Sequence, residues 1–466
     1  MIKENNRMVL LFPDGVGIRN YLYSDVFKNS PDNLLLYHAF DKSTEKTLRE
    51  ITAIKESYSI PDYNETTLEK FLRELICLSR LKYNTKQLGN PVIMTNWKKN
   101  HNVFFKQLFY KTIELASIVI NRYSSIQKLE GYYQRAIRKT AFYNQVSQQL
   151  TKMKVNQLFC SHQRGLACPT IFAAAQDLGI KTTTVIFSWD NLPKARMALR
   201  AEQYLVWSPY MKKEMSLYYP EIDQDKIYIT GTPQFECFQE NKNIIPKEVF
   251  FATYNLDPNK KIICFSGDDV KTSPDDPKYL HDLAEEIIKS NLDNQYQILF
   301  RRCPVDVSGR YDEVLSKYPK LIKKAPPLWN FDKAQSWTTI YPLKEDISLL
   351  VSTAYYADVV VNVGSTMAFD FAMFQKPCIY INYDQENKEE TSWSVNTIYQ
   401  FQHFRSMPDK KAVFWWSNKE DITAILEQMK FHNAMQDWQS VILGEYQTSS
   451  QKLSNILNLL VCTSAS

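Results

Sequence analysis

Short apolar runs alternate with amphipathic stretches along the first half of the chain. The runs are five or six residues long, as expected for buried strands, and include 8–12 (MVLLF), 33–38 (NLLLYH), 157–161 (QLFCS) and 203–207 (QYLVW). Between the second and the third run, residues 104–120 repeat apolar side chains at helical intervals of three and four. Strands that alternate with helices predict a parallel sheet whose two faces are covered by helices.

The alternation starts again near residue 261 and predicts a second α/β domain. Strand-like runs lie at 261–266, 297–301, 359–363 and 377–382, and two closing helices are expected at 419–429 and 435–460. The join falls in residues 235–260, which are rich in Asn, Lys and Glu. We therefore predict two Rossmann-like, doubly wound domains, 1–240 and 241–466, that face each other across a cleft. The C-terminal helices are expected to pack back toward the N-terminal domain.

The glycines mark where a ligand is expected. The chain has only 11, and seven of them flank predicted strands: Gly15, Gly17, Gly165, Gly179, Gly231, Gly267 and Gly364. Glycine permits a positive φ or a close approach of the backbone. Ligands of open α/β sheets bind at the carboxyl ends of the strands, so we expect the site at these turns.

Residues 362–377 (NVGSTMAFDFAMFQKP) form the most informative turn of the second domain. A predicted strand runs into Gly364, Ser365 and Thr366, and an apolar helix that contains Asp370 follows. Backbone N–H groups at a helix N-terminus favour phosphate, and a carboxylate one helical turn later suits a ribose diol. The alternative is that Ser and Thr only cap the helix and that Asp370 is solvated.

Two more turns of the second domain are expected at the same sheet edge. Arg301 and Arg302 end the strand ILFRR and can neutralise phosphate, although they point to opposite faces and one can be a plain surface residue. Ser266 and Gly267 end the first strand of this domain. We expect these residues at the same ligand site, and the family resemblance described below implies that all four, Ser266, Gly267, Arg301 and Arg302, bind the nucleotide of a donor.

Three turns of the first domain carry candidates for chemistry. Residues 13–20 (PDGVGIRN) offer Asp14 as a general base and Arg19 as a cation, but they are no dinucleotide fingerprint, because the third glycine is missing. His162 follows another strand, in SHQRG. A turn-forming Asp and a structural His are the alternatives.

The third of these turns, SWDNL, contains three further candidates. We expect Asp190 to belong to the catalytic group, and Trp189 and Asn191 to contact a sugar or the acceptor. Side chains of these types pack against sugar rings and hydrogen-bond to their hydroxyl groups.

Charge and cysteine usage narrow the class of protein. The formal net charge is +5, yet residues 70–160 hold 16 Lys and Arg against three Asp and Glu, interleaved with aromatic side chains. This basic helical segment, at about 70–155, presents either solvated helix faces or a surface for anionic lipid or an anionic acceptor. Eight Cys and six His are dispersed without ligand spacing, so we expect a reduced protein and no metal.

The N-terminal sequence contains too short an apolar run for a signal peptide, and no run reaches the length of a membrane span. We therefore expect a cytoplasmic protein, with peripheral contact at the inner membrane face as an additional possibility.

Five motifs, in this order, resemble a known family: SWDNL, QYLVWSPYMKKEM, KIYITGTPQFE, ILFRRCP and ADVVVNVGSTMAFDFAMFQKP. The sequence resembles the GT-B glycosyltransferases of bacterial surface-polysaccharide synthesis, which are related to CDP-glycerol glycerophosphotransferases and to UDP-N-acetylglucosamine 2-epimerases. The resemblance covers roughly residues 155–385.

The resemblance implies a metal-independent enzyme whose C-terminal domain holds the donor. Gly364, Ser365 and Thr366 would bind its pyrophosphate, Asp370 its ribose, and Arg301 or Arg302 its phosphate charge. The chain reads Arg-Arg-Cys-Pro where the family often has Arg-Pro-His-Pro, so it lacks that histidine. No cofactor is implied beyond a UDP-, GDP- or CDP-linked sugar.

The predicted function is transfer of a sugar to a glycan or lipid-linked acceptor in capsule, O-antigen or exopolysaccharide synthesis. Three alternatives are open: transfer of glycerol or ribitol phosphate from a CDP donor, epimerisation of a nucleotide sugar, and non-catalytic binding during polysaccharide assembly. Nothing in the composition indicates a nucleic-acid partner.

Overall fold

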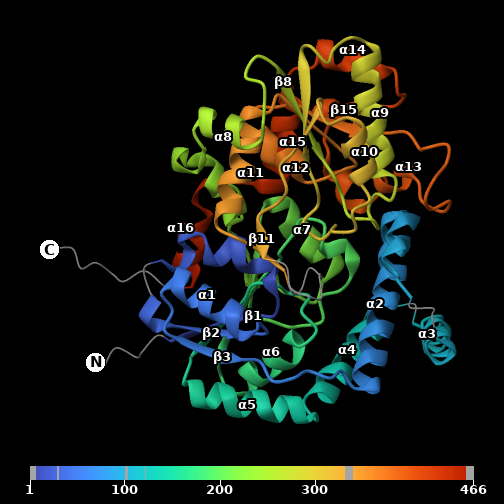
Figure 1. The fold of residues 1–466 in the computed structure, drawn as a ribbon. Coiled ribbons are helices and arrows are strands. Elements are labelled where there is room, and N and C mark those ends of the chain that lie inside the picture. The colour runs from blue at the N-terminus through green and yellow to red at the C-terminus, as the bar shows by residue number, and fades with distance from the viewer. Residues whose placement is uncertain (1–6, 29–30, 100–102, 121, 331–339, 458–466) are drawn as a thin grey trace. The chain divides into compact units, whose positions relative to one another are not determined.

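A computed structural model describes residues 7–28, 31–99, 103–120, 122–330 and 340–457. By packing, the chain divides into unit 1, residues 1–233 and 442–466, and unit 2, residues 234–441. Each unit is built around one parallel sheet (Figure 1). The division predicted from sequence, at 240 and 241, stays a prediction.

The sheet of unit 1 has seven strands in the order β3-β2-β1-β4-β5-β6-β7, all parallel. They are β1 Met8–Phe12, β2 Leu34–His38, β3 Glu56–Ser59, β4 Gln157–Cys160, β5 Lys181–Val185, β6 Gln203–Val206 and β7 Ile227–Ile229. Every residue of β1, β2 and β4 is buried, which explains their uninterrupted apolar runs.

The helices of unit 1 connect and cover these strands. They are α1 Lys42–Thr52, α2 Thr67–Leu88, α3 Phe104–Ala116, α4 Tyr123–Ile137, α5 Ala141–Met153, α6 Cys168–Asp177, α7 Pro209–Tyr218 and α16 Ser449–Ile456. The longest, α2, begins with a capping box in which Thr66 and Glu69 satisfy each other's backbone N–H groups. In the described residues, no helix is both long and apolar enough to cross a bilayer.

The sheet of unit 2 has six parallel strands in the order β10-β9-β8-β13-β14-β15. They are β8 Lys261–Ser266, β9 Tyr296–Arg301, β10 Ile322–Lys324, β13 Val359–Asn362, β14 Cys378–Ile381 and β15 Phe414–Trp416. A separate antiparallel pair joins β11 Trp329–Asn330 and β12 Tyr341–Pro342.

The helices of unit 2 are α8 Lys247–Thr253, α9 Asp276–Lys289, α10 Asp312–Lys317, α11 Glu345–Tyr356, α12 Met367–Ala372, α13 Val395–Ile398 and α14 Asp421–Gln428, and α15 Asn433–Leu443 runs from unit 2 into unit 1. The two doubly wound α/β folds predicted from the alternating pattern are confirmed.

The C-terminal segment packs on unit 1, as expected. Ser454 of α16 donates a hydrogen bond to the carbonyl of Val26 at 2.6 Å. The single helix predicted over 435–460 is wrong, because α15 ends at Leu443 and Gly444 follows with φ +56°. A Cβ at Gly444 would lie 3.0 Å from the carbonyl oxygen of Trp207, so the chain turns sharply at the one residue that has no side chain.

Candidate functional site

Asp14 and His162 meet at the carboxyl ends of two neighbouring strands of unit 1. Because β1 and β4 pair in parallel, the loops that follow Phe12 and Cys160 lie beside each other. Asp14 Oδ2 is 2.6 Å from His162 Nδ1. The other oxygen of the buried Asp14 carboxylate accepts a hydrogen bond from the Val16 N–H at 3.1 Å. The fold therefore joins two of the residues predicted as catalytic, whose role stays a prediction.

This pair has the geometry of a general base. The hydrogen bond engages Nδ1, which makes Nε2 the ring nitrogen that can take a substrate proton. The His162 side chain keeps 14% of its exposure. The ring of Phe187 packs edge-on against the imidazole, with ring centres 5.7 Å apart. A fixed imidazole beside a carboxylate can accept a proton and hold the resulting positive charge.

Two glycines allow the loops around this pair to approach. A Cβ at Gly17 would lie 2.5 Å from the Cβ of Ser161, and a Cβ at Gly165 would lie 2.8 Å from the Cβ of Pro13. Each glycine thus packs directly against the loop after the other strand. The reason for these glycines is the close approach of the two loops.

Asp190 lies in a hydrogen-bonded turn after β5. Its carboxylate accepts a bond from Asn191 Nδ2 at 2.8 Å and pairs with the ammonium group of Lys194. Gln163 joins this turn to the His162 loop, because its Nε2 donates to Asn191 Oδ1 at 3.1 Å. Sequence reasoning did not select Gln163, although it directly follows His162. The structure therefore links Asn191 to the Asp14–His162 pair through one amide side chain.

The remaining candidates of unit 1 differ in burial. Arg19 is half-buried and its Nε donates to Asn20 Oδ1 at 3.3 Å, whereas Trp189 is almost fully buried. A cation that the sequence did not single out, Arg164, lies near the acids of this site. Burial lowers the pKa of its guanidinium, and the charges of Asp190 and Asp14 oppose that shift.

Glu214 on α7 is a buried carboxyl group close to this site. Burial, with the charge of Asp190 added, raises the pKa of Glu214 to about 8, while Tyr210 and Tyr218 oppose the shift. The pKa of a Glu in an unfolded chain is about 4.3. Between that pH and about 8, the folded protein therefore holds a proton that the unfolded chain has released. The stability linked to this group is complete below about pH 4.3 and is lost as the pH rises toward 8.

We predict that Glu214→Gln removes this pH dependence. Between about pH 6 and pH 7.5, the free energy of unfolding of the unmodified protein should fall by about 2 kcal/mol relative to that of the variant. Urea denaturation at both pH values measures the difference, with the exposed Glu202→Gln as the matched control. If the free energies of unfolding of Glu214→Gln and of the unmodified protein change by the same amount between the two pH values, this carboxyl does not titrate in that range.

In unit 2, the turn after β13 has the predicted shape. Gly364 has φ +68°, and a Cβ there would lie 2.8 Å from Cζ of Phe404, so the turn requires glycine. The backbone N–H of Ser365 donates to Asn362 Oδ1 at 2.8 Å. The turn leads into α12, at whose N-cap position Thr366 stands. Packing alone thus explains Gly364, and phosphate binding by the turn stays a prediction.

Asp370 is buried, with 4% of its surface exposed. The alternative in which this acid is simply solvated is therefore wrong. Ser365 does cap the helix, because its Oγ accepts a hydrogen bond from the Met367 N–H at 3.4 Å. A buried carboxylate in an otherwise apolar helix needs hydrogen-bond partners or a counter-charge. Ribose recognition by Asp370 stays a prediction.

Both arginines at the end of β9 are held by protein groups. Arg301 is buried, and its Nη2 lies 2.9 Å from each oxygen of Asp346 on α11, so the surface alternative is wrong for it. The half-buried Arg302 donates from Nη1 to the carbonyl oxygens of Cys303 and Pro304 at 3.1 and 2.9 Å. The predicted phosphate contacts of the two arginines stay predictions.

Ser266 and Gly267 end β8 at the same edge of the sheet. The N–H of Gly267 donates to the Arg301 carbonyl at 2.9 Å, and Ser266 is largely buried. Behind them, the N–H of Asp268 donates to Asp276 Oδ2 at 2.5 Å. Burial raises the pKa of both carboxyls, and the two repel each other. Burial thus disfavours the charged form of both carboxyls.

A cavity of about 270 Å³ opens beside this edge. Its lining combines aromatic and charged side chains, among them Phe300, Arg302, Tyr311 and Lys324. Pockets for nucleotide-sized ligands measure roughly 300–1,000 Å³, so the cavity can take part of such a ligand. Two acids, Asp306 and Asp312, line it as well, so its charges balance, and the aromatic rings suit a planar group.

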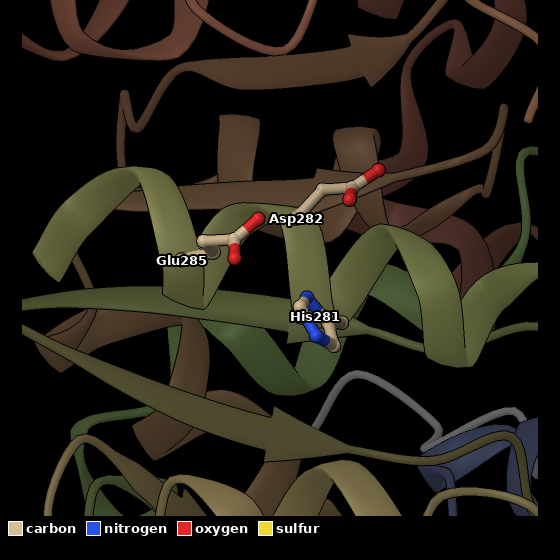
Figure 2. Close-up of side chains that lie close together, drawn as sticks. All are labelled: His281, Asp282 and Glu285. Atoms are coloured by element: carbon tan, nitrogen blue, oxygen red, sulfur yellow. The ribbon is translucent and has the colours of Figure 1, made fainter. Parts of the chain in front are cut away.

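A second cluster lies on α9, where Figure 2 shows the side chains of His281, Asp282 and Glu285. Their ligand atoms lie within 4.8 Å of one another. One Asp282 oxygen, however, accepts a bond from the Lys419 ammonium at 2.8 Å, and the Lys317 ammonium is 2.8 Å from His281 Nε2. Two ammonium groups at these atoms disfavour a divalent cation, so we assign no metal to this cluster.

No protein-family model and no curated protein matches the sequence. Solved structures, in contrast, are similar to the whole chain at low identity. The complex of S. aureus MnaA with UDP superposes with a TM-score of 0.50 at 10% identity and covers 98% of either chain.

Two further structures are UDP-GlcNAc 2-epimerases. The enzyme of Neisseria meningitidis bound to UDP-GlcNAc gives a TM-score of 0.50 at 9% identity, and that of Methanocaldococcus jannaschii gives 0.51 at 12%. Each comparison covers 97% of this chain and 100% of the other. This likeness and the two parallel sheets confirm the GT-B fold predicted from the sequence motifs.

Proposed function

We propose that this chain is a metal-independent glycosyltransferase that uses a nucleotide sugar. The acceptor is a glycan or a lipid-linked sugar of capsule, O-antigen or exopolysaccharide synthesis. The observation that carries the proposal is the hydrogen bond between Asp14 and His162 at the carboxyl ends of β1 and β4, where a sheet of this kind places its chemistry. We take UDP as the first choice of nucleotide, because two of the similar structures contain UDP or UDP-GlcNAc.

In this proposal, unit 1 supplies the base. Nε2 of His162 removes the proton of the acceptor hydroxyl, and the Asp14 carboxylate stabilises the imidazolium that forms. The acceptor oxygen then bonds to the anomeric carbon as the bond from that carbon to the donor's phosphate oxygen breaks. Asp190, Asn191, Trp189 and Arg19 orient the acceptor or its sugar.

Unit 2 binds the donor. The N–H groups and hydroxyls of the turn from Gly364 to Thr366 hold the pyrophosphate, and Asp370 accepts bonds from the ribose. Of the two arginines, Arg302 is the better phosphate ligand, because it lines the cavity whereas Arg301 is held by Asp346. Ser266 and Gly267, at the end of β8, contact the nucleotide in this proposal.

Epimerisation is the second candidate, favoured by the identity of the similar structures. An epimerase converts UDP-GlcNAc in the absence of an acceptor, whereas a transferase releases UDP only when an acceptor is present. Glycerol or ribitol phosphate transfer would instead require a CDP donor. A non-catalytic assembly protein would bind the glycan without any nucleotide.

A thermal-shift titration with UDP, GDP and CDP tests the nucleotide assignment. Ligand at about ten times its Kd adds about 1.4 kcal/mol to stability, which raises the unfolding midpoint by about 3 °C when unit 2 unfolds by itself and by about 1.5 °C when the whole chain unfolds together. Asp370→Ala and Asp370→Asn should weaken that shift at least about tenfold in apparent Kd. The exposed Asp437→Ala is the control. An undiminished shift in both Asp370 variants would refute the ribose assignment, and no shift with any nucleotide would refute the proposed function.

We further place the protein in the cytoplasm, at the inner face of the membrane, where lipid-linked acceptors lie. This part of the proposal rests on the basic, aromatic segment at about 70–155.

A further inference from the structure

Helix α3 carries apolar side chains on two opposite sides. Helix α3 lies beside α2 (Figure 1). On its inner side, Tyr110 and Ile113 are buried in one cluster with Leu75 and Leu78 of α2. A surface helix normally needs one apolar stripe, and the stripe that faces α2 already fulfils that need. The second apolar side therefore requires its own explanation.

The outer side of α3 is exposed to solvent. Phe104 is 72% exposed, Phe105 78%, Leu108 54% and Leu115 60%. At 3.6 residues per turn these four side chains fall within an arc of roughly 100°. Ile118 and Val119, which follow the helix, are also exposed. Seven of the twenty exposed large apolar side chains of the described residues lie in 103–119, so this is a patch and not scattered exposure.

Exposed cations accompany the patch. At 3.6 residues per turn Lys111 lies beside Phe104 on α3, and Lys98 and Arg122 are exposed before and after the helix. The single acid in residues 98–122, Glu114, is neutralised by Lys99, since the two form an ion pair of 2.7 Å. An exposed apolar face with a cationic border is the pattern of a helix that lies in the interface of an anionic bilayer.

Charge also decides between a bilayer and a second copy of the chain. A symmetric dimer through this face would bring the two cationic borders against each other. Anionic lipid headgroups instead attract each Lys or Arg near the surface by about 1 kcal/mol. The border is thus complementary to a lipid surface and repels its own copy.

We propose that the outer face of α3 docks on an anionic membrane surface. Phe104, Phe105, Leu108 and Leu115 enter the boundary between headgroups and acyl chains, while the lysines remain at the phosphates. This inference deepens the membrane part of the proposed function. Its test uses vesicles without nucleotide, so its failure can be told apart from a failure of the nucleotide-sugar assignment.

Vesicle co-sedimentation of the purified full-length protein tests the proposal. We expect binding to phosphatidylcholine vesicles with about 25 mol% phosphatidylglycerol to be at least about tenfold tighter than to pure phosphatidylcholine. The double variant Phe104→Ser/Phe105→Ser should bind at least about tenfold more weakly. The control Val249→Ser removes a 54% exposed apolar side chain of α8 and should bind as before.

Charge reversal gives the second arm. Lys111→Glu/Arg122→Glu should lose about 30-fold or more in affinity for anionic vesicles, whereas Lys152→Glu/Lys320→Glu, with the same change in net charge, should lose far less. Equal binding to neutral and anionic vesicles would overturn the proposal. So would vesicle binding that survives the Phe substitutions, or a dimer in analytical ultracentrifugation that those substitutions dissociate.

Discussion

Replacing His162 with alanine is expected to lower the turnover number by about 10²–10⁴-fold and to leave nucleotide binding unchanged. The reason is the 2.6 Å contact between His162 Nδ1 and Asp14 Oδ2, which orients the imidazole and leaves Nε2 to act on the substrate. Without the ring, the acceptor hydroxyl would have to lose its proton to water. Release of UDP from a UDP-sugar in the presence of acceptor measures the loss, and a thermal shift with UDP measures binding.

Asp14→Asn separates positioning from basicity. Asparagine keeps the size of the side chain but cannot stabilise an imidazolium, so we expect a loss of about 10–10³-fold, smaller than that of His162→Ala. His281→Ala, on α9 of unit 2, is the matched control and should retain full turnover. If His162→Ala keeps more than about a tenth of the normal turnover, His162 is not the base, and the Asp14–His162 pair is a structural contact.

The strands and their loops could be predicted, but the partners of the loops could not. Asp14 and His162 were each selected because they follow an apolar run. Their contact depends on β1 pairing with β4, and 144 residues of other structure lie between these strands. Apolar periodicity identifies a strand but carries no information about its neighbour in the sheet. The sequence therefore predicts candidates at a sheet edge, and only the fold shows which of them meet.

In unit 2, likewise, the sequence does not show which charged side chains pair with each other. Asp346, which the sequence analysis does not single out, lies inside the first turn of α11 and binds Arg301. The same carboxylate accepts bonds from the Leu328 N–H and from Trp329 Nε1. A buried guanidinium needs a counter-charge, and the partner is 45 positions away. Local spacing cannot reveal such a pair.

In the basic segment at about 70–155, the positions of the charged side chains differ most from what the sequence suggests. Its Lys and Arg residues suggest a wholly solvated surface, but Arg80 on α2 is only 1% exposed. Its guanidinium donates to the Tyr218 carbonyl at 2.6 Å, pairs with Glu130 and Glu221, and lies 4.3 Å from the ring centre of Tyr219. One arginine thus ties α2 to α4 and to the segment after α7, while the lysines of α3 remain outside.

A second arginine completes this buried network. Arg200 pairs with Glu221 at 2.9 Å and also with Glu130. Burial alone would raise the pKa of Glu130, but the Arg200 and Arg80 guanidiniums hold it below its ordinary value. The pKa of Glu130 thus depends on the two arginines together. Removal of either arginine leaves two largely buried carboxylates with one cation.

We accordingly expect Arg80→Met to lower the free energy of unfolding by about 3–5 kcal/mol. Removing one partner of a buried ion pair leaves the charge of the other partner buried and uncompensated. Methionine fills most of the volume, so the loss reports charge and hydrogen bonds more than packing. Urea denaturation of the full chain measures it. The control Arg138→Ala breaks a partly exposed pair with Asp177 and should cost no more than about 1 kcal/mol.

The double variant Arg80→Met/Glu221→Gln sharpens the test. Removing one carboxylate restores the balance with Arg200, so the double variant should be more stable than Arg80→Met alone, by about 1–2 kcal/mol. If the two substitutions instead add their separate losses, Arg80 acts through packing and its carbonyl bond, and the network of charges is not what holds α2 to α4.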